Sequence, residues 1–170
     1  MSAELQTAWI GMGANLGDAR LALQKAVQSI AALPQTRVLR VSSLYGSAPV
    51  DATGPDYLNA VAEISTSLSP FALLDGLQAI ERDAGRERPY RNAPRTLDLD
   101  IVRFGDLVMT TERLTLPHPR WNERAFVLLP MAELLGEQVL TALTDRQKVL
   151  VAEQRIERKA APAEWCPSTG

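Results

Sequence analysis

The feature that most constrains the fold of this chain is the order in which the spacing of apolar residues changes over its first 104 residues. Apolar residues at every second position predict a strand, whereas apolar residues every three or four positions predict a helix. These spacings predict strand, helix, strand, strand, helix and strand over residues 7–14, 23–33, 36–45, 57–66, 70–85 and 96–104. This order is typical of a split βαβ, ferredoxin-like sandwich, an α+β fold with a mainly antiparallel sheet and helices packed on it.

Residues with strong local preferences set the ends of these elements. Pro34 closes the first helix, Ser69-Pro70 is an N-cap followed by proline at the first helical position, and Gly85 is placed to stop that helix. Residues 46–55 and 86–95 carry prolines without apolar periodicity. We therefore expect loops there, the second of them mobile.

Beyond residue 104 the predicted elements are shorter. Gly105-Asp106 suggests a turn, residues 112–116 a short strand and residues 123–135 a helix. Thr144-x-x-Gln147 fits a capping box that would open a helix through Arg158. We expect a single domain over residues 1–160 and a flexible tail over residues 161–170.

Charge and cysteine content exclude several kinds of protein. The net charge is −2 and the pI about 5.5, so no global positive field would attract nucleic acid or a membrane. Cys166 is the only cysteine, which excludes an intrachain disulfide and a cysteine-based metal site. The sequence has neither a signal-peptide pattern nor a run of 18 apolar residues. We expect a cytoplasmic monomer with small-molecule substrates.

The most informative stretch is Arg95-Thr96-Leu97-Asp98-Leu99-Asp100-Ile101. Because side chains alternate along a strand, Asp98 and Asp100 would share one face, about 7 Å apart along the backbone. Two neighbouring carboxylates repel each other unless a cation offsets their charge, and magnesium carrying nucleotide phosphates would do so. A solvated strand face that pairs with nearby arginines is the alternative interpretation.

Arginines cluster just before this pair. Five of them fall within fourteen residues: Arg82, Arg86, Arg88, Arg91 and Arg95. Their charge beside paired carboxylates suits a site for a metal–triphosphate complex. An RNA-binding patch is the alternative, but Tyr90 is the only aromatic residue interleaved with the cluster.

A stiff segment with a histidine follows the pair. His118, the only histidine, lies between two prolines in Arg113-Leu114-Thr115-Leu116-Pro117-His118-Pro119. A lone histidine is more often structural, yet the flanking prolines would hold this one rigidly, which suits a hydrogen-bond donor to phosphate.

These motifs together resemble a known family. Pro94-Arg95-Thr96-Leu97-Asp98-Leu99-Asp100 resembles the signature of the hydroxymethyldihydropterin pyrophosphokinases. The resemblance covers residues 7–135 and includes further motifs in the same order: Gly-x-Gly-x-Asn-Leu-Gly over residues 11–17, Asp56-Tyr57-Leu58-Asn59-Ala60, Leu114-Thr115-Leu116-Pro117-His118-Pro119 and Glu123-Arg124-Ala125-Phe126.

The resemblance implies a reaction and a set of roles. ATP would give its β,γ-pyrophosphoryl group to the hydroxymethyl oxygen of the dihydropterin, a step in folate biosynthesis that leaves AMP. Asp98 and Asp100 would hold two magnesium ions and act in catalysis with Arg86 and Arg95. The residues around ATP would be Gln78, Glu81, Arg88, Arg95, Ile101, Arg113, Thr115, His118 and Arg124. Those around the pterin would be Ser47, Ala48, Val50, Tyr57, Asn59 and Phe126.

The residues themselves support the pterin assignment. Tyr57 and Asn59 fall on one face of their predicted strand. A flat heterocycle needs aromatic stacking, here by Tyr57 and Phe126, and directed hydrogen bonds at its polar edge, here from Asn59.

One departure concerns the arginine loop. Many members of the family carry a tryptophan there, where this chain has Asn92, and Tyr90 could take its place. We expect residues 86–94 to close over bound ATP and exclude water.

Two other classes of protein compete with this interpretation. Gly11, Gly13 and Gly17 suggest a dinucleotide-binding turn, but Leu16 stands where the third glycine should be, so these glycines more plausibly allow a close approach of a pterin or a neighbouring strand. A ferredoxin-like binding module without catalysis would share the fold. The pair Asp98 and Asp100 discriminates, because a transferase needs it and an RNA binder does not.

Overall fold

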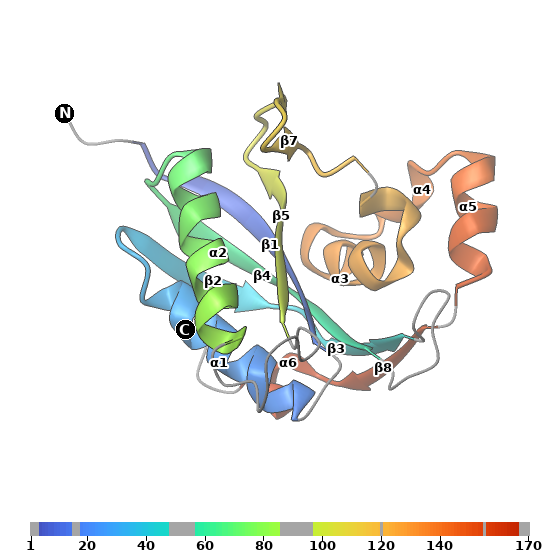
Figure 1. The fold of residues 1–170 in the computed structure, drawn as a ribbon. Coiled ribbons are helices and arrows are strands. Elements are labelled where there is room, and N and C mark those ends of the chain that lie inside the picture. Colours follow the sequence, from blue (N-terminus) through green and yellow to red (C-terminus); the bar gives the residue numbers. More distant parts are fainter. Residues whose placement is uncertain are drawn as a thin grey trace.

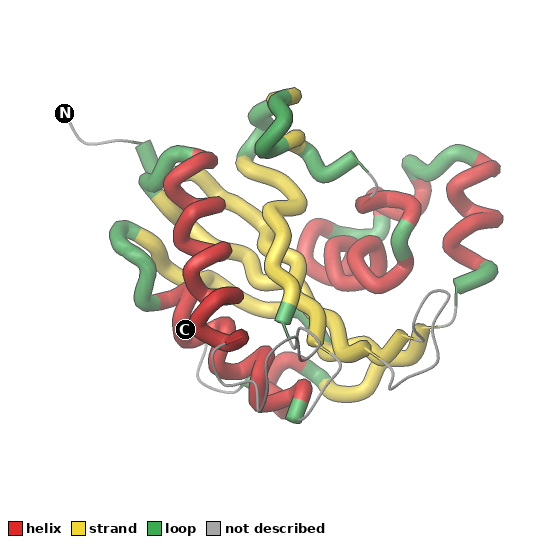
Figure 2. The backbone as a smooth tube through the Cα atoms, in the orientation of Figure 1, coloured by secondary structure: helices red, strands yellow, loops and turns green. Residues whose placement is uncertain are grey.

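The computed structural model describes residues 4–14, 18–47, 57–85, 97–119, 121–154 and 156–166, and six strands of this part form one sheet (Figure 1). All its pairings are antiparallel. The main path across it runs through β5 (Asp98–Phe104), β1 (Gln6–Ala14), β4 (Tyr57–Thr66), β3 (Leu44–Ser47) and β8 (Ile156–Ala160), and β2 (Thr36–Val41) also pairs with β4. Helices pack on this sheet, which confirms the predicted α+β sandwich (Figure 2).

The predicted strand over residues 36–45 is two strands, β2 and β3, which pair with successive parts of β4. The break lies at Ser42 and Ser43, both fully buried. Ser42 N donates to Val61 O, and Ser42 Oγ accepts from Val61 N, each at 2.9 Å. Because one serine uses both backbone groups of Val61, the regular ladder is interrupted there.

One face of the sheet packs against α1 (Ala19–Ala31) and α2 (Pro70–Gly85). Asp18 caps α1 by accepting from Leu21 N, and Ser69 caps α2 by accepting from Ala72 N, as its sequence predicts. The helical stripe predicted for α1 is confirmed, because Leu23, Ala26, Val27 and Ile30 are buried. The main core of the molecule lies between these helices and the sheet.

The elements that the structure describes cover only part of the opposite face. The short helix η1 (Trp121–Glu123) leads into α3 (Ala125–Leu135), and a second core joins Trp9, Val61 and Val102 of the sheet to Met131 and Leu134 of α3. The remainder of this face, toward the start of β4 and of β5, forms the floor of a cavity.

A buried carboxylate ties the covered part together. Glu63, 9% exposed, accepts from Trp9 Nε1 at 2.9 Å and from Arg40 Nε at 2.8 Å. Arg40 also donates to Leu134 O at the end of α3, and the hydrogen bond to Glu63 raises the pKa of Arg40. The buried charge is therefore paired, as a buried charge must be.

After β5 the chain makes the predicted turn at Gly105-Asp106 and then a small hairpin of β6 (Met109–Thr110) and β7 (Thr115–Leu116). The strand predicted over residues 112–116 is thus limited to its last two residues. Thr111 and Leu114 close the turn through hydrogen bonds between Thr111 Oγ1 and the backbone of Leu114.

In the C-terminal third of the chain, one predicted helix is not found as predicted. α4 (Gln138–Thr141) is followed by α5 (Asp145–Ala152), whose capping box between Thr144 and Gln147 is confirmed. A helix through Arg158 is wrong, because the chain leaves α5 at Ala152 and enters β8. Pairing of β8 with the free edge of β3 overrides the helical preference of this charged segment.

The start of the expected tail is also folded. Residues 162–165 form the short helix α6 (Pro162–Trp165), and Trp165 is completely buried in the main core. The boundary expected at residue 160 therefore lies inside the packed unit, which extends at least to Cys166. In the described part of the chain, no helix combines the length and the apolar character of a membrane span.

Candidate active site

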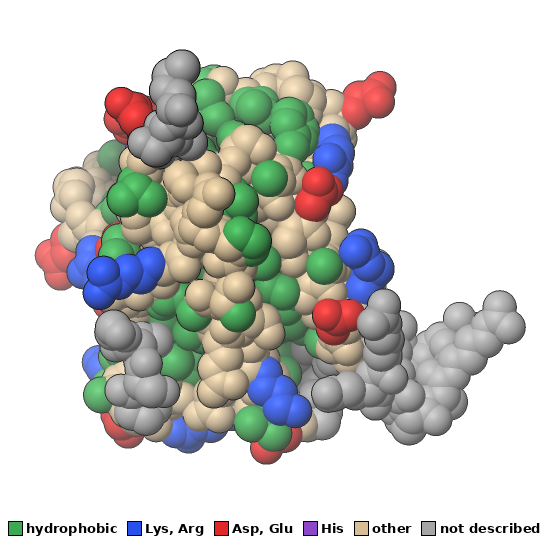
Figure 3. All heavy atoms as spheres, turned by 90° about the vertical axis from the view of Figure 1, so that its left-hand side faces the viewer, with side chains coloured by type: hydrophobic (Ala, Val, Ile, Leu, Met, Phe, Trp, Pro, Cys, Tyr) green, Lys and Arg blue, Asp and Glu red, His purple; other side chains and the backbone are tan. Residues whose placement is uncertain are grey.

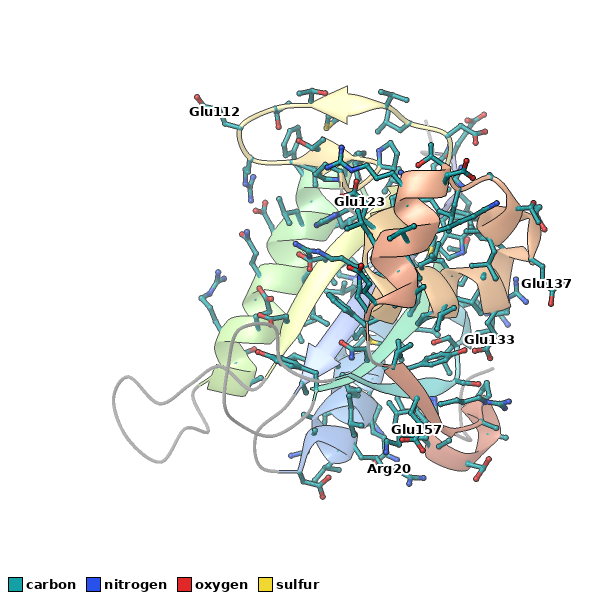
Figure 4. All side chains as sticks on the ribbon, turned by 90° about the vertical axis from the view of Figure 1, so that its right-hand side faces the viewer. Arg20, Glu112, Glu123, Glu133, Glu137 and Glu157 are labelled. Carbon is teal, nitrogen blue, oxygen red and sulfur yellow. The ribbon has the colours of Figure 1, made fainter. Side chains whose placement is uncertain are left out.

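A cavity of about 1030 Å³ opens above the uncovered part of the sheet. It lies between α2, the segment around β7 and the beginning of α3 (Figure 4). Most of the predicted site residues are found in its lining: Tyr57, Asn59, Gln78, Glu81, Asp98, Asp100, Ile101, Arg113, Thr115, His118, Arg124 and Phe126. Segments that are up to seventy residues apart in the sequence are thus brought together.

The carboxylate pair has the predicted orientation. Asp98 and Asp100 are exposed on β5, whereas Leu97, Leu99 and Ile101 are buried in the main core. The two carboxylates therefore share one face of the strand, and that face forms part of the cavity wall.

Two glycines of β1 lie between the carboxylate pair of β5 and the side-chain amide of Asn59 on β4. Gly13 of β1 pairs with Asp98 on one side and with Asn59 on the other, and Gly11 pairs with Asp100 and Val61. Residues directly opposite each other in a sheet point to the same face, so Asp98 and Asn59 face the same cavity, two strand spacings or about 10 Å apart.

The space above Gly13 is small. A Cβ atom added to Gly13 would lie 3.1 Å from Asn59 Oδ1, and Asn59 is only 4% exposed. The glycines thus permit the close approach of a neighbouring strand's side chain, one of the two roles expected from the sequence.

Glu81 links α2 to the strand of the carboxylate pair. Its Oε2 accepts from Leu99 N at 2.8 Å, between Asp98 and Asp100. Because β5 is an edge strand, the N–H groups that point away from β1 need other acceptors. Glu81 therefore fixes the separation of α2 from β5, and with it the width of this side of the cavity.

Two basic residues lie on the same side. Arg113 forms an ion pair with Asp75 of α2, and its Cζ lies 5.7 Å from the centre of the Phe71 ring. His118 N donates to Val102 O at 2.8 Å, which attaches the segment after β7 to β5. Asp75 and Phe71 were not predicted from the sequence, where nothing distinguishes them from other residues of an amphipathic helix.

The aromatic residues come from opposite walls. Tyr57 is the first residue of β4 and Phe126 lies in the first turn of α3, and both side chains are half-buried. The Cζ of Arg124 lies 5.8 Å from the centre of the Phe126 ring. Both aromatic residues thus line the same cavity as Asn59 and the glycines of its floor, as a site for a flat group requires.

Some predicted residues cannot be placed. Ala48, Val50, Arg86, Arg88 and Arg95 lie outside the described residues, as does the loop expected to close over ATP. Ser47 is described through its backbone, which pairs with Tyr57 at the end of β3.

Gln154, which follows α5, is among the cavity-lining residues that sequence reasoning missed. Its side-chain amide contacts the backbone on both sides of Arg124, through Glu123 O and Ala125 N. Arg124 is a poor N-cap residue, and this is the one signal in the sequence that could have pointed to an acceptor elsewhere.

The donor set fits magnesium. Magnesium is usually held by one or two carboxylates together with water and substrate phosphates, rather than by a complete cage of protein ligands. Asp98 and Asp100 supply two exposed carboxylates at the cavity wall. Within the ranges that the structure describes, no group of three or more His, Cys, Asp or Glu side chains is arranged to hold a metal ion.

Comparison with known proteins gives consistent relatives. The sequence profile of the 7,8-dihydro-6-hydroxymethylpterin-pyrophosphokinase (HPPK) family matches residues 9–136. The 2-amino-4-hydroxy-6-hydroxymethyldihydropteridine pyrophosphokinase of Pseudomonas aeruginosa is 45% identical over 131 residues, which are 76% of this chain and 81% of that protein. The protein of the same name from Bacillus subtilis is 41% identical over 152 residues, which are 87% of this chain and 91% of that protein.

Solved structures support the fold. The wild-type HPPK-DHPS of Plasmodium falciparum, solved with pterin and p-hydroxybenzoate, superposes with a TM-score of 0.64 at 14% identity over 89% of this chain. This chain spans 43% of the length of that solved chain. The likeness confirms the ferredoxin-like sandwich, and the sequence matches over most of both partners establish that this chain belongs to the 7,8-dihydro-6-hydroxymethylpterin-pyrophosphokinase family.

Proposed function

We propose that this chain transfers the pyrophosphoryl group of ATP to the hydroxymethyl group of 6-hydroxymethyl-7,8-dihydropterin, giving AMP and the pterin diphosphate for folate biosynthesis. The observation that carries this proposal is the shared floor on which an acidic pair, Asp98 and Asp100, and a buried amide, Asn59, face one cavity. Ligand pockets occupy roughly 300–1,000 Å³, and a cavity of about 1030 Å³ lies at the upper end of that range, as a site for two small substrates requires.

The pterin would occupy the side of the cavity formed by β4 and α3. Tyr57 and Phe126 would stack on its two faces, and Asn59 would hydrogen-bond its polar edge. The backbone at Ser47, Ala48 and Val50 would complete this subsite.

The triphosphate would occupy the side formed by α2, β5 and the segment around β7. Arg113, His118 and Arg124 would neutralise charge there together with Arg86, Arg88 and Arg95, of which Arg86 and Arg95 would act directly on the transferred group. Gln78, Glu81, Ile101 and Thr115 would line the rest of the nucleotide subsite. For Arg113, binding would mean exchanging Asp75 for a phosphate.

Asp98 and Asp100 would hold two magnesium ions between these subsites. When bound, magnesium neutralises phosphate charge and polarises the transferred group. The chain's own contribution is positioning, because it aligns the hydroxymethyl oxygen with the triphosphate across the glycine floor.

The decisive experiment combines the protein, magnesium-ATP and 6-hydroxymethyl-7,8-dihydropterin and measures AMP and pterin diphosphate. We expect Asp98→Asn and Asp100→Asn each to lower turnover by about a hundredfold or more while circular dichroism shows an intact fold. The matched control is Asp106→Asn, in the turn after the same strand, where the carboxylate is fully exposed and 3.6 Å from Arg103 Nη2. Turnover near the wild-type rate in either cavity variant would show that the acidic pair is not the metal site.

We further propose that the enzyme acts as a monomer in the cytoplasm. Its proposed co-substrate ATP is abundant in the cytoplasm. Size-exclusion chromatography with light scattering measures the oligomeric state directly.

A further inference from the structure

The beginning of α3 lacks the cap that helices usually have. The first N–H groups of a helix have no partner within the helix, and an oxygen of the N-cap side chain normally accepts one of them. The N-cap residue of α3 is Arg124, which has no acceptor atom in its side chain and makes no capping hydrogen bond. Arg124 lines the cavity instead.

Gln154 supplies the missing acceptor from another part of the chain. Its Oε1 accepts from Ala125 N, the first N–H of α3, at 2.7 Å. Its Nε2 donates to Glu123 O at 2.6 Å and to Leu150 O, in the last turn of α5, at 3.1 Å. These partners fix the orientation of the amide, because only one assignment of its oxygen and nitrogen satisfies all three.

The amide of Gln154 thus holds the backbone immediately before and after Arg124. α5 packs against η1, and Figure 4 labels Glu123 beside α5. The restrained backbone is also the one that directs Arg124 and Phe126 into the cavity, where the Arg124 guanidinium lies over the Phe126 ring. A shift of this turn would move both side chains together.

We propose that Gln154 is a positioning residue for the reaction: it caps α3 in place of Arg124 and thereby holds Phe126 against the bound pterin and Arg124 toward the triphosphate. This inference rests on the proposed function, because it takes the pterin as the group that Phe126 contacts. It also gives a role to the segment after residue 136, where the sequence motifs of the site end.

The test compares two variants of Gln154 with a control on α5, the helix that precedes it. Gln154→Leu keeps the approximate volume and removes all three hydrogen bonds. Gln154→Glu keeps an acceptor for Ala125 N but places a second carboxylate oxygen against the carbonyls of Glu123 and Leu150. The control, Gln147→Ala, removes the capping box at the start of α5, whose hydrogen bonds join Gln147 to Thr144.

Binding is measured separately for each substrate, by pterin fluorescence and by nucleotide titration, with unfolding monitored by circular dichroism. We expect both Gln154 variants to weaken pterin binding about tenfold, the scale of a lost helix cap. Magnesium-ATP binding should change by no more than about twofold, because Arg124 shares the triphosphate with several other basic side chains of the proposed site. In Gln147→Ala we expect both dissociation constants to stay within about twofold of wild type, since α3 keeps its cap.

Comparing the binding of the two substrates distinguishes a positioning role of Gln154 from a general destabilisation of the protein. Equal losses for pterin and nucleotide, or unchanged pterin binding in folded Gln154→Leu or Gln154→Glu, would overturn the proposed positioning role. Failure of the wild-type protein to bind the pterin at all would instead refute the proposed function, and this inference with it.

Discussion

Gly13 stands between the acidic pair and the pterin-binding amide proposed for this enzyme, and its missing side chain shapes the floor that they share. The glycines with positive φ in the described part of the chain are Gly105 and Gly136, so alanine at position 13 would bring no backbone strain. What constrains position 13 is the side chain of Asn59, 3.1 Å from an added Cβ.

We predict that Gly13→Ala weakens pterin binding about tenfold, because the added methyl group forces the Asn59 amide away from its hydrogen-bonding position. The free energy of unfolding should change by less than about 1 kcal/mol, since alanine suits a strand backbone at least as well as glycine does. Fluorescence titration and urea unfolding measure the two quantities.

A double-mutant cycle supplies the control. In an Asn59→Ala background, Gly13→Ala should cause no further loss of pterin binding, because the atom it displaces is absent. An equal loss in both backgrounds would show that the methyl group blocks the ligand itself rather than acting through Asn59.

At the scale of elements, β3 and α3 are joined by a hydrogen-bonded carboxylate. Glu133 of α3 accepts from Ser43 N at 2.9 Å, from Ser43 Oγ at 2.9 Å and from Tyr45 Oη at 2.9 Å. Burial, and next the hydrogen bond to Glu133, raise the pKa of Tyr45 above its usual value near 10. This contact orients β3, which ends at the proposed pterin subsite.

The raised pKa predicts an alkaline loss of stability. A group whose pKa is higher in the folded state stabilises the protein fully below its unfolded pKa, and this contribution falls as pH rises towards the folded pKa. The stability difference between wild type and Tyr45→Phe should therefore shrink between pH 8 and about pH 11. Urea unfolding of both proteins at the two pH values measures it, and a difference that stays constant or grows would contradict the assignment.

The sequence predicted best those helices and strands that pack one face against the main core. Alternation in Tyr57–Thr66 and in Asp98–Phe104 predicted both the strands and the side chains that face the cavity, because strand periodicity is a local property. The family resemblance likewise pointed to many of the residues that line the cavity, whereas their roles toward the ligands stay predictions.

Three of the failures involve distant partners. Ser42 interrupts a strand because its backbone and side chain bind Val61, and the segment at Ile156–Ala160 is a strand because β3 offers a free edge. Gln154 caps α3 from twenty-nine residues away. None of these contacts leaves a periodic signal in the residues that make it.

On the scale of the whole molecule, an acidic protein is proposed to bind a highly anionic substrate. On the face in Figure 3, blue and red side chains are interspersed among apolar and neutral ones rather than gathered by sign. Attraction for the triphosphate must then be local. Three of the arginines proposed for the site, Arg86, Arg88 and Arg95, lie between α2 and β5 in the sequence.

The C-terminal segment completes both sides of the sheet. Gln154 restrains the cavity on one face, β8 extends the sheet at β3, and Trp165 enters the main core beneath the other face. Trp165 Nε1 donates to Ser42 O at 2.9 Å, at the break between β2 and β3. Gln24 and Arg20 of α1 donate to the carbonyl oxygens of Trp165 and Glu164, so this end of the chain is attached to both the sheet and a helix.

We predict that a chain ending at Ala160 is less stable than the full chain by about 3–5 kcal/mol, the scale on which removal of a fully buried tryptophan lowers the free energy of unfolding. A chain ending at Cys166 should match the full chain, and Trp165→Ala should reproduce most of the loss in an otherwise complete protein. Urea unfolding followed by circular dichroism measures all four proteins without relying on tryptophan fluorescence. Equal stability of the chains ending at Ala160 and at Cys166 would mean that α6 rests on the core without stabilising it.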